Sequence, residues 1–548
     1  MDTIGLGNRN IVRLVPLLLA VSGILPAMGC SSAYQTNRAN QEVEAILGPA
    51  VPRFNRERRL SVKEPETTAP ADTPRMPGSP EEADSDRSGA GREQETLTLT
   101  LLDTLENALA TNRQQISRKE SLYLTALGLA GTRHSFTPQL SAVCNYLFSD
   151  GTGRASGHSA GLGFSASQIL PSGGTLSFNA DTAFAQDNTA GLADPRTYSS
   201  SLGLNLSRPL LRGAGREIAF ESLLQAERNL IYAIRDFELF RQEFSIDVAN
   251  RYYDLVRQKK TIENRHQNKE KLDYAHRKAK AFNNVGKSTE IEVLRARQDA
   301  LDAENELIIA EQDYELALDN FRIFLGFPAG ARVEVTPDEP VFIPVDYDVD
   351  SAVEVAIANR LDHLTRREQL EDAERGLRIT ENSLLPDLGL NLGYSLSSDP
   401  IPGFGSQKLD NGSLSAGLSL EIPIDRVSER HSFRRAQISY AAQKRSFDES
   451  RDQLIVGVAS SLRELKRQKR TLDIQQQQIE DAERSVRIAE LRLDRGEIDN
   501  RDLLESRQNE LDARNRLIDE KVNYEITRLR LLKNLGILFI DERGMWTE

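Results

Sequence analysis

Apolar positions follow two different periods along this chain, one typical of helices and one typical of strands. In the helix-like parts, apolar residues recur every seven positions, as in the series Leu294, Leu301 and Ile308. Seven-residue spacing builds the seam of a coiled coil. Each such series follows a short turn, so the pattern predicts one helix at about 289–326 and a second at about 501–536.

The helical pattern occurs twice with nearly the same residues. The stretch "RQNELDARNRLI" at 507–518 matches "RQDALDAENELI" at 297–308 at eight of twelve positions. Further matched positions recur in the same order: Asn112–Arg113 with Asn359–Arg360, Pro138 with Pro386, Tyr146 with Tyr394, Pro209 with Pro423, Gly286 with Gly496, and Gly326 with Gly536. The chain therefore repeats one structural unit, and two copies suit a pseudo-symmetric ring better than an open solenoid.

Each copy also contains a shorter and a very long helix-like segment. The shorter segments cover about 99–133 and 351–383, and the long ones cover about 214–282 and 427–493. A helix of about 65 residues, rising about 1.5 Å per residue, reaches roughly 100 Å. Helices of that length can extend a structure across a wide compartment.

Strand-like alternation fills 139–207 in the first copy and 386–398 and 412–422 in the second. Leucines dominate the apolar positions, and Gly, Ser and Asn occupy the positions between them. About ten residues of this pattern are typical of a transmembrane β-barrel that faces lipid outside and water inside. A soluble sandwich would also alternate, but its inner face usually mixes in Val, Ile and Trp. Four to six strands per chain are fewer than the eight of the smallest single-chain barrels, which predicts an oligomer.

The N-terminus resembles a secretory signal. Arg9 and Arg13 precede an apolar run of about 15 residues, too short for a spanning helix. We expect residues 1–29 to be a signal peptide. The run ends at Cys30 in a pattern similar to bacterial lipoprotein signals, in which the Cys becomes lipidated, although Ala27 stands where Leu is usual. The alternative is ordinary cleavage near Gly29, which leaves a free thiol.

The remaining boundaries follow from composition. Residues 61–95 are rich in Pro, Glu, Asp, Ser and Gly, which cannot bury enough apolar surface to offset chain entropy. We therefore predict a disordered, lipid-anchored tether over 30–96. The folded body divides into a first repeat at 97–329, a connector at 330–350, a second repeat at 351–540 and a tail at 541–548.

Composition narrows the possible functions. The hydrophobic fraction is 39% and the charged fraction 28%, which fits long, partly solvated helices. The net charge of −13 argues against a nucleic-acid partner. Six His and two Cys show no metal-ligand spacing, and the chain contains no P-loop or HExxH motif. We predict neither a metal site nor a catalytic site, and no cofactor besides the expected lipid on Cys30.

Together these motifs resemble the TolC-type outer-membrane efflux family over about 97–540. The resemblance rests on the duplicated "NR" and "P.L" motifs, "SRPLLRGAGRE" at 207–217, "VGKSTEIEVL" at 285–294, "RGEIDNRDLL" at 495–504, and the two "LG" endings. It implies a homotrimer in which each chain adds strands to one transmembrane β-barrel and helices to one periplasmic α-barrel. The implied function is a passive outer-membrane conduit for efflux or secretion.

The resemblance also implies partners and sites. The partners are a periplasmic adaptor and an inner-membrane transporter, besides the lipid of the outer membrane. The adaptor would dock on the two helical turns, at Val285, Gly286, Lys287, Arg495, Gly496 and Glu497. A cap at the helix end explains both glycines equally well.

In that family, acidic residues narrow the periplasmic mouth, and the matching positions here are Asp502 and Glu505. Six carboxylates in a trimer would favour cations. Favourable interaction with the helix dipole is the alternative role. The first copy carries Glu292 and Arg295 at the equivalent positions, and Thr289 with Glu292 reads as a capping box.

Three questions stay open at this level. A coiled-coil periplasmic scaffold without a pore is the alternative function, although it would not need the strand stripes. The exported cargo and the class of pump cannot be read. Residues 158–185 are long enough for two strands more than the family usually has, joined by a turn at Pro171–Gly174. Those strands would either widen the barrel or sit outside it.

Overall fold

The computed structural model describes most of the chain. The described residues are 32–54, 97–151, 154–187, 196–286, 288–328, 330–338, 340, 342–345, 347–399, 409, 411–495, 497–498 and 500–547. The expected signal peptide and Cys30 lie outside these residues, as do Lys287, Gly496 and most of the expected tether.

The described elements alternate between long helices and strands in chain order. They are α2 (Ser32–Phe54), β1 (Leu97–Leu99), α3 (Leu101–Thr111), α4 (Arg113–Ser135), β2 (Gln139–Gly151), β3 (Arg154–Ile169), β4 (Thr175–Asp187), β5 (Arg196–Pro209), α5 (Arg216–Ala219), α6 (Glu221–Asn284), α7 (Glu290–Leu325), β6 (Val333–Val335), α8 (Val349–Asn359), α9 (Leu361–Asn382), β7 (Asp387–Ser397), β8 (Asn411–Glu421), α10 (Val427–Asp494), α11 (Asn500–Leu535), β9 (Phe539–Ile540) and β10 (Trp546–Thr547).

The described residues group into two compact units, each built from several stretches of chain. Unit 1 takes them from Met1–Glu57, Ser121–Ile234 and Glu368–Arg445, and unit 2 from Arg58–Glu120, Arg235–Arg367 and Ser446–Glu548. Unit 1 contains the large sheet with the helix ends that adjoin it. Unit 2 contains the paired long helices and two small two-stranded sheets, β1 with β6 and β9 with β10.

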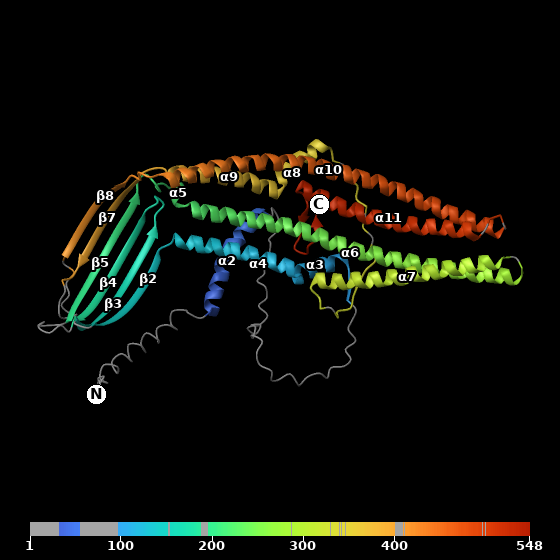
Figure 1. Cartoon of the computed structure of the whole chain (residues 1–548), viewed down its shortest axis with the longest axis horizontal. Coiled ribbons are helices and arrows are strands. Elements are labelled where there is room, and N and C mark those ends of the chain that lie inside the picture. The colour runs from blue at the N-terminus through green and yellow to red at the C-terminus, as the bar shows by residue number, and fades with distance from the viewer. Residues whose placement is uncertain are drawn as a thin grey trace, which may run out of the picture. The chain divides into compact units, whose positions relative to one another are not determined.

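The sheet of unit 1 has six antiparallel strands in the order β2-β3-β4-β5-β7-β8 (Figure 1). The first repeat therefore contributes four strands and the second contributes two. The strands expected within 158–185 exist as parts of β3 and β4, and they lie inside the sheet between β2 and β5. The turn between them is closed by the Leu170 amide, which donates to the carbonyl oxygen of Gly174 at 2.7 Å.

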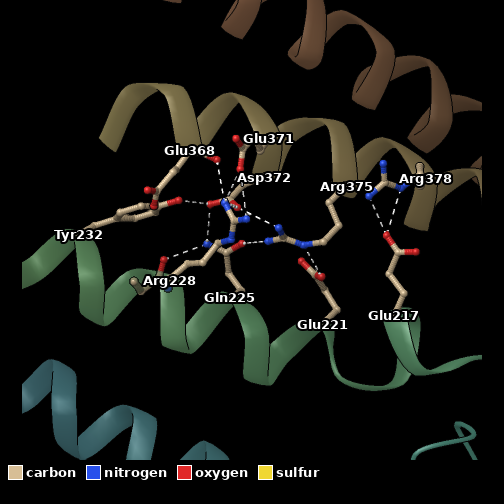
Figure 2. Close-up of polar contacts among 11 residues, drawn as sticks. Glu217, Glu221, Gln225, Arg228, Tyr232, Glu368, Glu371, Asp372, Arg375 and Arg378 are labelled. Carbon is tan, nitrogen blue, oxygen red and sulfur yellow. Dashed lines mark hydrogen bonds and ion pairs between the residues drawn. The ribbon is translucent and has the colours of Figure 1, made fainter. Parts of the chain in front are cut away.

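The helix ends of unit 1 are joined by charged side chains. Arg375 of α9 is only 5% exposed and contacts three partners: the carboxylates of Glu221 at 2.7 Å and Asp372 at 2.9 Å, and the amide oxygen of Gln225 at 2.8 Å (Figure 2). A buried charge is tolerated only when it is paired and hydrogen-bonded. This network therefore fixes how α6 and α9 pack at the base of the sheet.

The same network includes a tyrosine. The Tyr232 hydroxyl donates to Asp372 Oδ2 at 2.6 Å, and Arg228 pairs with Asp372 at 2.9 Å (Figure 2). Burial, with the nearby Asp372 carboxylate, raises the pKa of Tyr232 to about 12. The hydroxyl thus remains a proton donor to the carboxylate at any physiological pH. At the edge of the network, Arg378 pairs with Glu217 at 2.8 Å, and both side chains are more than half exposed.

The N-terminal part of the chain differs from the sequence-based expectation. Residues 32–54, within the expected tether, form helix α2. Val43 and Leu47, four residues apart on one face, are buried, and the Tyr123 hydroxyl of α4 donates to Asn40 Oδ1 at 2.5 Å. The disordered reading was based on the composition of 61–95, which lies outside the described residues. It was wrong for 32–54, because a short apolar stripe is enough to dock a helix.

Unit 2 has two large apolar clusters, and the repeated motifs of each repeat make close contacts within this unit. In the first repeat, the Asn112 amide of the "NR" pair donates to the Phe324 carbonyl at 2.6 Å, next to the "LG" ending of α7. In the second, the backbone of Asn359 lies against Gly536. Both glycines, Gly326 and Gly536, have positive φ. A side chain there would be strained and would strike the neighbouring backbone.

These contacts explain one error in the predicted boundaries. The segments 99–133 and 351–383 were expected to be single helices, but each is split, at Asn112 and at Arg360. Asn112 leaves the helix to bond the end of α7 and to accept, through its side chain, the amides of Gln114 and Gln115. The segment 214–282 was also expected to be a single helix, but it is split at Phe220 into α5 and α6. The remaining helix ends agree with the periodicity within a few residues. Among the described residues, no helix combines the length and apolarity needed to cross a membrane.

Candidate functional site

The first helical turn lies between α6 and α7. The Gly286 amide donates to the Asn283 carbonyl at 2.9 Å, and Gly286 has φ +73°, a conformation that favours glycine. Its neighbour Val285 is 67% exposed. Beyond the turn, Thr289 and Glu292 form the expected capping box at the start of α7. The turn is thus a well-capped tip that presents an apolar side chain to solvent. Lys287, the third predicted docking residue, lies outside the described residues.

The second helical turn lies between α10 and α11. The Glu497 amide donates to the Arg492 carbonyl at 2.9 Å, and the Arg495 guanidinium lies 3.8 Å from the Glu497 carboxylate. Both side chains of this pair are at least half exposed. A surface pair of this kind contributes little stability, so both groups remain available to a partner. Gly496 lies outside the described residues.

The predicted constriction residues Asp502 and Glu505 lie in the first turns of α11. They are exposed and three positions apart, so they share a helix face. Between them, Leu503 is buried against Val486 and Ala489 of α10. This packing points the two carboxylates away from the helix pair and into solvent. Whether they line a pore depends on neighbouring chains, so their role stays a prediction.

The equivalent acid of the first repeat has a different role. The Ser288 hydroxyl and the Thr289 backbone hold the Glu292 carboxylate and keep the pKa of Glu292 below its usual value. Because its oxygens already accept these hydrogen bonds, the exposed Glu292 carboxylate serves as a helix cap. The two tips therefore differ in chemistry although their sequences are related.

Sequence reasoning missed a polar seam between α6 and α11 in unit 2. Glu510 is buried and pairs with Arg514 at 2.7 Å and with Lys271 of α6 at 3.8 Å. Next to it, the Asn264 amide donates to Asn515 Oδ1 at 2.8 Å. The available clue was the repeat itself, because Glu510 replaces Ala300 in a stretch where eight of twelve positions match. A charge substituted at a position that is small and apolar in the other copy indicates a specific partner.

The six-stranded sheet presents two chemically different faces. Register pairs apolar residues across strands on one face, as in Leu390 with Leu418 and Tyr394 with Leu414. Leu414 is 79% exposed, and the aromatic and leucine side chains of this face are widely exposed in the single chain. The free thiol of Cys144 is exposed on the same face. Contiguous exposed apolar surface of this kind marks a membrane or protein contact.

The opposite face carries mostly Ser, Gly, Asn and Ala. One row across it reads Val143, Gly163, Asp181, Ser201 and Ser397. Val143, Leu147 and Ile169 are among its larger apolar exceptions. One apolar and one polar face over strands of 11 to 16 residues match a wall between lipid and water. Within the described residues, no group of three His, Cys, Asp or Glu side chains is placed to hold a metal ion.

Comparisons with known proteins agree with this arrangement. The model of the family described as "Outer membrane efflux protein" matches residues 173–326 and 352–537. Among solved structures, the outer membrane protein VceC of Vibrio cholerae is similar with a TM-score of 0.59 and 16% identity, over 80% of this chain and 96% of that one.

Two further structures have the same fold. The CmeC outer membrane channel of Campylobacter jejuni gives a TM-score of 0.59 with 17% identity, over 80% of this chain and 85% of that one. The open state of the MtrE outer membrane channel of Neisseria gonorrhoeae gives 0.56 with 14% identity, over 81% and 90%. No curated protein sequence matches the chain.

Proposed function

The chain belongs to the outer membrane efflux protein family, and we propose that three copies of it form one passive export conduit through the outer membrane. As a member of this family it is an outer-membrane channel protein of a tripartite efflux system. That membership argues against the alternative of a coiled-coil scaffold without a pore. Trimer formation, the lipid-facing wall and the partners are the proposed parts.

The observation that carries the proposal is the open sheet of unit 1. β2 and β8 each pair with a single neighbour in the described sheet, so each leaves one edge free. Strand direction alternates across the six strands, which makes β2 and β8 antiparallel. The edge of β8 in one copy can therefore pair with the edge of β2 in the next. Closure by three copies leaves no open edge, which a wall in lipid requires.

A disulfide test addresses this closure. In a Cys144→Ser background, Ser141→Cys on β2 would be combined in turn with cysteines at Ser413, Ser415 and Ser419 on β8. The proposal expects one of these pairs to give covalent dimers and trimers under oxidation, and Ser141→Cys alone to give none. Absence of cross-linked species for every pair, with a monomer in native membranes, would contradict the trimer.

We further propose that the two tips dock a periplasmic adaptor, which links the channel to an inner-membrane transporter. Support comes from the exposed Val285 at one tip and the weakly paired Arg495 and Glu497 at the other. Photo-crosslinkers at Val285 and Glu497 should capture a periplasmic protein. One at Ile474, exposed on the side of α10, is the matched control. Equal capture at all three positions would count against the docking sites.

Lipidation of Cys30 remains part of the same proposal. Its support is the sequence alone, an apolar run that ends in "AMGC". Mass spectrometry of the mature N-terminal peptide would detect the diacylglyceryl group on the Cys30 sulfur. A mature N-terminus without added lipid mass would indicate ordinary cleavage instead.

A further inference from the structure

The two repeats differ most in their strands. In the second repeat, β7 and β8 are neighbours in the sheet, whereas in the first, β3 and β4 lie between β2 and β5. Because the extra strands come as a hairpin, β2 and β5 remain antiparallel, like β7 and β8. The hairpin thus enters the sheet without changing the strand direction at either edge.

The hairpin is paired along its full length. β3 pairs with β2 from Ser167 to Gly157, and β4 pairs with β5 from Thr175 to Gln186. β3 has 16 residues and β4 has 13, more than the 9 to 11 that a tilted strand needs to cross a bilayer. Both strands are therefore long enough to form part of a membrane wall.

The turn of the hairpin is tied to the junction between the sheet and the helices. The Gly215 amide donates to the Ser172 carbonyl at 3.2 Å. Gly173 has φ +91°, and a side chain there would strike the Gly213 carbonyl. This close packing against the start of α5 sets the position of the hairpin at the base of the sheet.

The two faces of the sheet continue across the hairpin. Phe164 and Phe178 stack edge to face on the apolar side, with ring centroids 6.4 Å apart. On the polar side, Asp181 leans over Gly163, so that a Cβ at Gly163 would stand 2.8 Å from Asp181 Oδ1. Ser415 lies over Gly393 in the same way on β7 and β8. Because these polar side chains lie over glycines, the side chains of this face project only a short distance from the sheet backbone.

We infer that the hairpin widens the outer part of the conduit so that it passes bulky hydrophilic cargo. The inference rests on the proposed trimer. Three copies of the observed six strands give an 18-stranded wall, whereas three copies without β3 and β4 would give 12. Barrel diameter grows roughly linearly with strand number, and barrels of 16 to 18 strands leave an aqueous channel. Ser, Gly and Asn have short polar side chains, so the polar face leaves the lumen of the barrel open to water and polar solutes.

The test measures lumen width with and without the hairpin. Deleting residues 154–187 joins β2 to β5 through residues 152–153 and 188–195. Ser201→Cys, on the polar face of β5 and present in both proteins, is the probe in a Cys144→Ser background. Intact cells would be treated with maleimide-polyethylene glycols of increasing size. The largest polymer that labels the deletion variant should have a diameter about one-third smaller than for the full chain.

An equal size limit for both trimers would overturn the inference. If the deletion prevents assembly, a pair of cysteine variants in the full-length chain tests whether the hairpin is part of the wall. A charged, water-soluble thiol reagent should label Ser177→Cys on the polar face of β4 and leave Phe178→Cys, on the apolar face, unlabelled. Equal labelling of the two would place the hairpin outside the wall and overturn the inference. Failure of the undeleted protein to form trimers would be a different result, because it would overturn the proposed channel as well.

Discussion

The two repeats share their packing and differ in their charge and in their strands. Buried small and apolar positions recur in α7 and α11, as with Ala303 and Ala513. The four differences between the matching twelve-residue stretches are polar or charged on at least one side: Asp299 with Asn509, Ala300 with Glu510, Glu304 with Arg514, and Glu306 with Arg516. Glu304 and Glu306 face Lys269 and Arg265 of α6, whereas Glu510 and Arg514 form the seam with Lys271. The positions that the two repeats share pack the helices together. The positions that differ determine which charged side chains of α6 each helix pairs with.

The contact that joins the two repeats in unit 1 should give one of the two largest effects. Arg375→Ala removes the buried guanidinium that the partly buried Glu221 and Asp372 share, and leaves Asp372 paired with Arg228 only. We expect a loss of about 2–3 kcal/mol in unfolding free energy, as when hydrogen bonds to charged groups are removed. Arg378→Ala, which removes an exposed pair on the next turn, should cost about 1 kcal/mol or less. Thermal unfolding of the detergent-solubilised protein compares the stability of the two variants. Equal losses of stability would contradict the claim that Arg375 holds α6 and α9 together.

Exchanging one residue between the repeats tests the seam. Ala300→Glu places an unpaired carboxylate beside Leu272 and Ala303, and should cost about 3 kcal/mol or more. The reverse change, Glu510→Ala, leaves Arg514 paired with Glu483 and removes the pairing of Lys271 with Glu510. Both cations are partly exposed and can be hydrated. Glu510→Ala should therefore cost only about 1 kcal/mol. Denaturant unfolding gives both values. A larger loss for Glu510→Ala than for Ala300→Glu would contradict the assignment of roles.

The acids at the two tips should differ in their effect on ion selectivity. Asp502→Asn with Glu505→Gln removes two exposed carboxylates per chain, so the cation preference in planar bilayers should fall and the reversal potential should move toward zero. Glu292→Gln, at the equivalent place in the first repeat, should leave the reversal potential unchanged because Glu292 is engaged in the helix cap. A shift from Glu292→Gln alone would place that residue at the pore.

The smallest expected effect is a pH dependence specific to the second repeat. His363 is buried against Phe447, and Ile116 holds its place in the first repeat. Burial lowers the pKa of His363, with Arg367 and Arg360 adding to the effect and Asp362 opposing it. The unfolded chain then binds a proton more readily, so stability should decline as pH falls below about 6.5. His363→Ile should flatten that decline, and an unchanged pH profile would exclude His363 as its source.

The sequence was sufficient for the long helices and for the strand faces, because both rest on periodicity. Heptad leucines place α7 and α11 within a residue or two, and alternation places β7 and β8 equally well. The sequence could not show whether β3 and β4 belong to the sheet. Alternation indicates which residues of a strand share a face, but not which strands pair with each other. The breaks at Asn112 and Arg360 were missed because they depend on contacts with helix ends more than 170 residues away in the chain.

The candidate site was predictable only in part. The "VGKST" and "RGEID" turns located both tips, since glycine at a helix end has a local cause. The burial of Glu510 has a distant cause, the position of Lys271 on another helix. Periodicity alone could not show it, and only the comparison with Ala300 in the other repeat pointed to it. Helix α2 was missed because its stripe of Val43 and Leu47 is too short to outweigh its polar composition.

Electron cryo-microscopy of the protein in lipid nanodiscs tests the central claim most directly, because it counts chains and strands in one ring. The account predicts three copies whose sheets close a single wall of 18 strands, with Leu390 and Leu418 toward lipid and Asp181 toward a water-filled centre. A ring of 12 strands would contradict the place assigned to the hairpin. A monomer, or a sheet whose leucine face points to water, would contradict the channel itself.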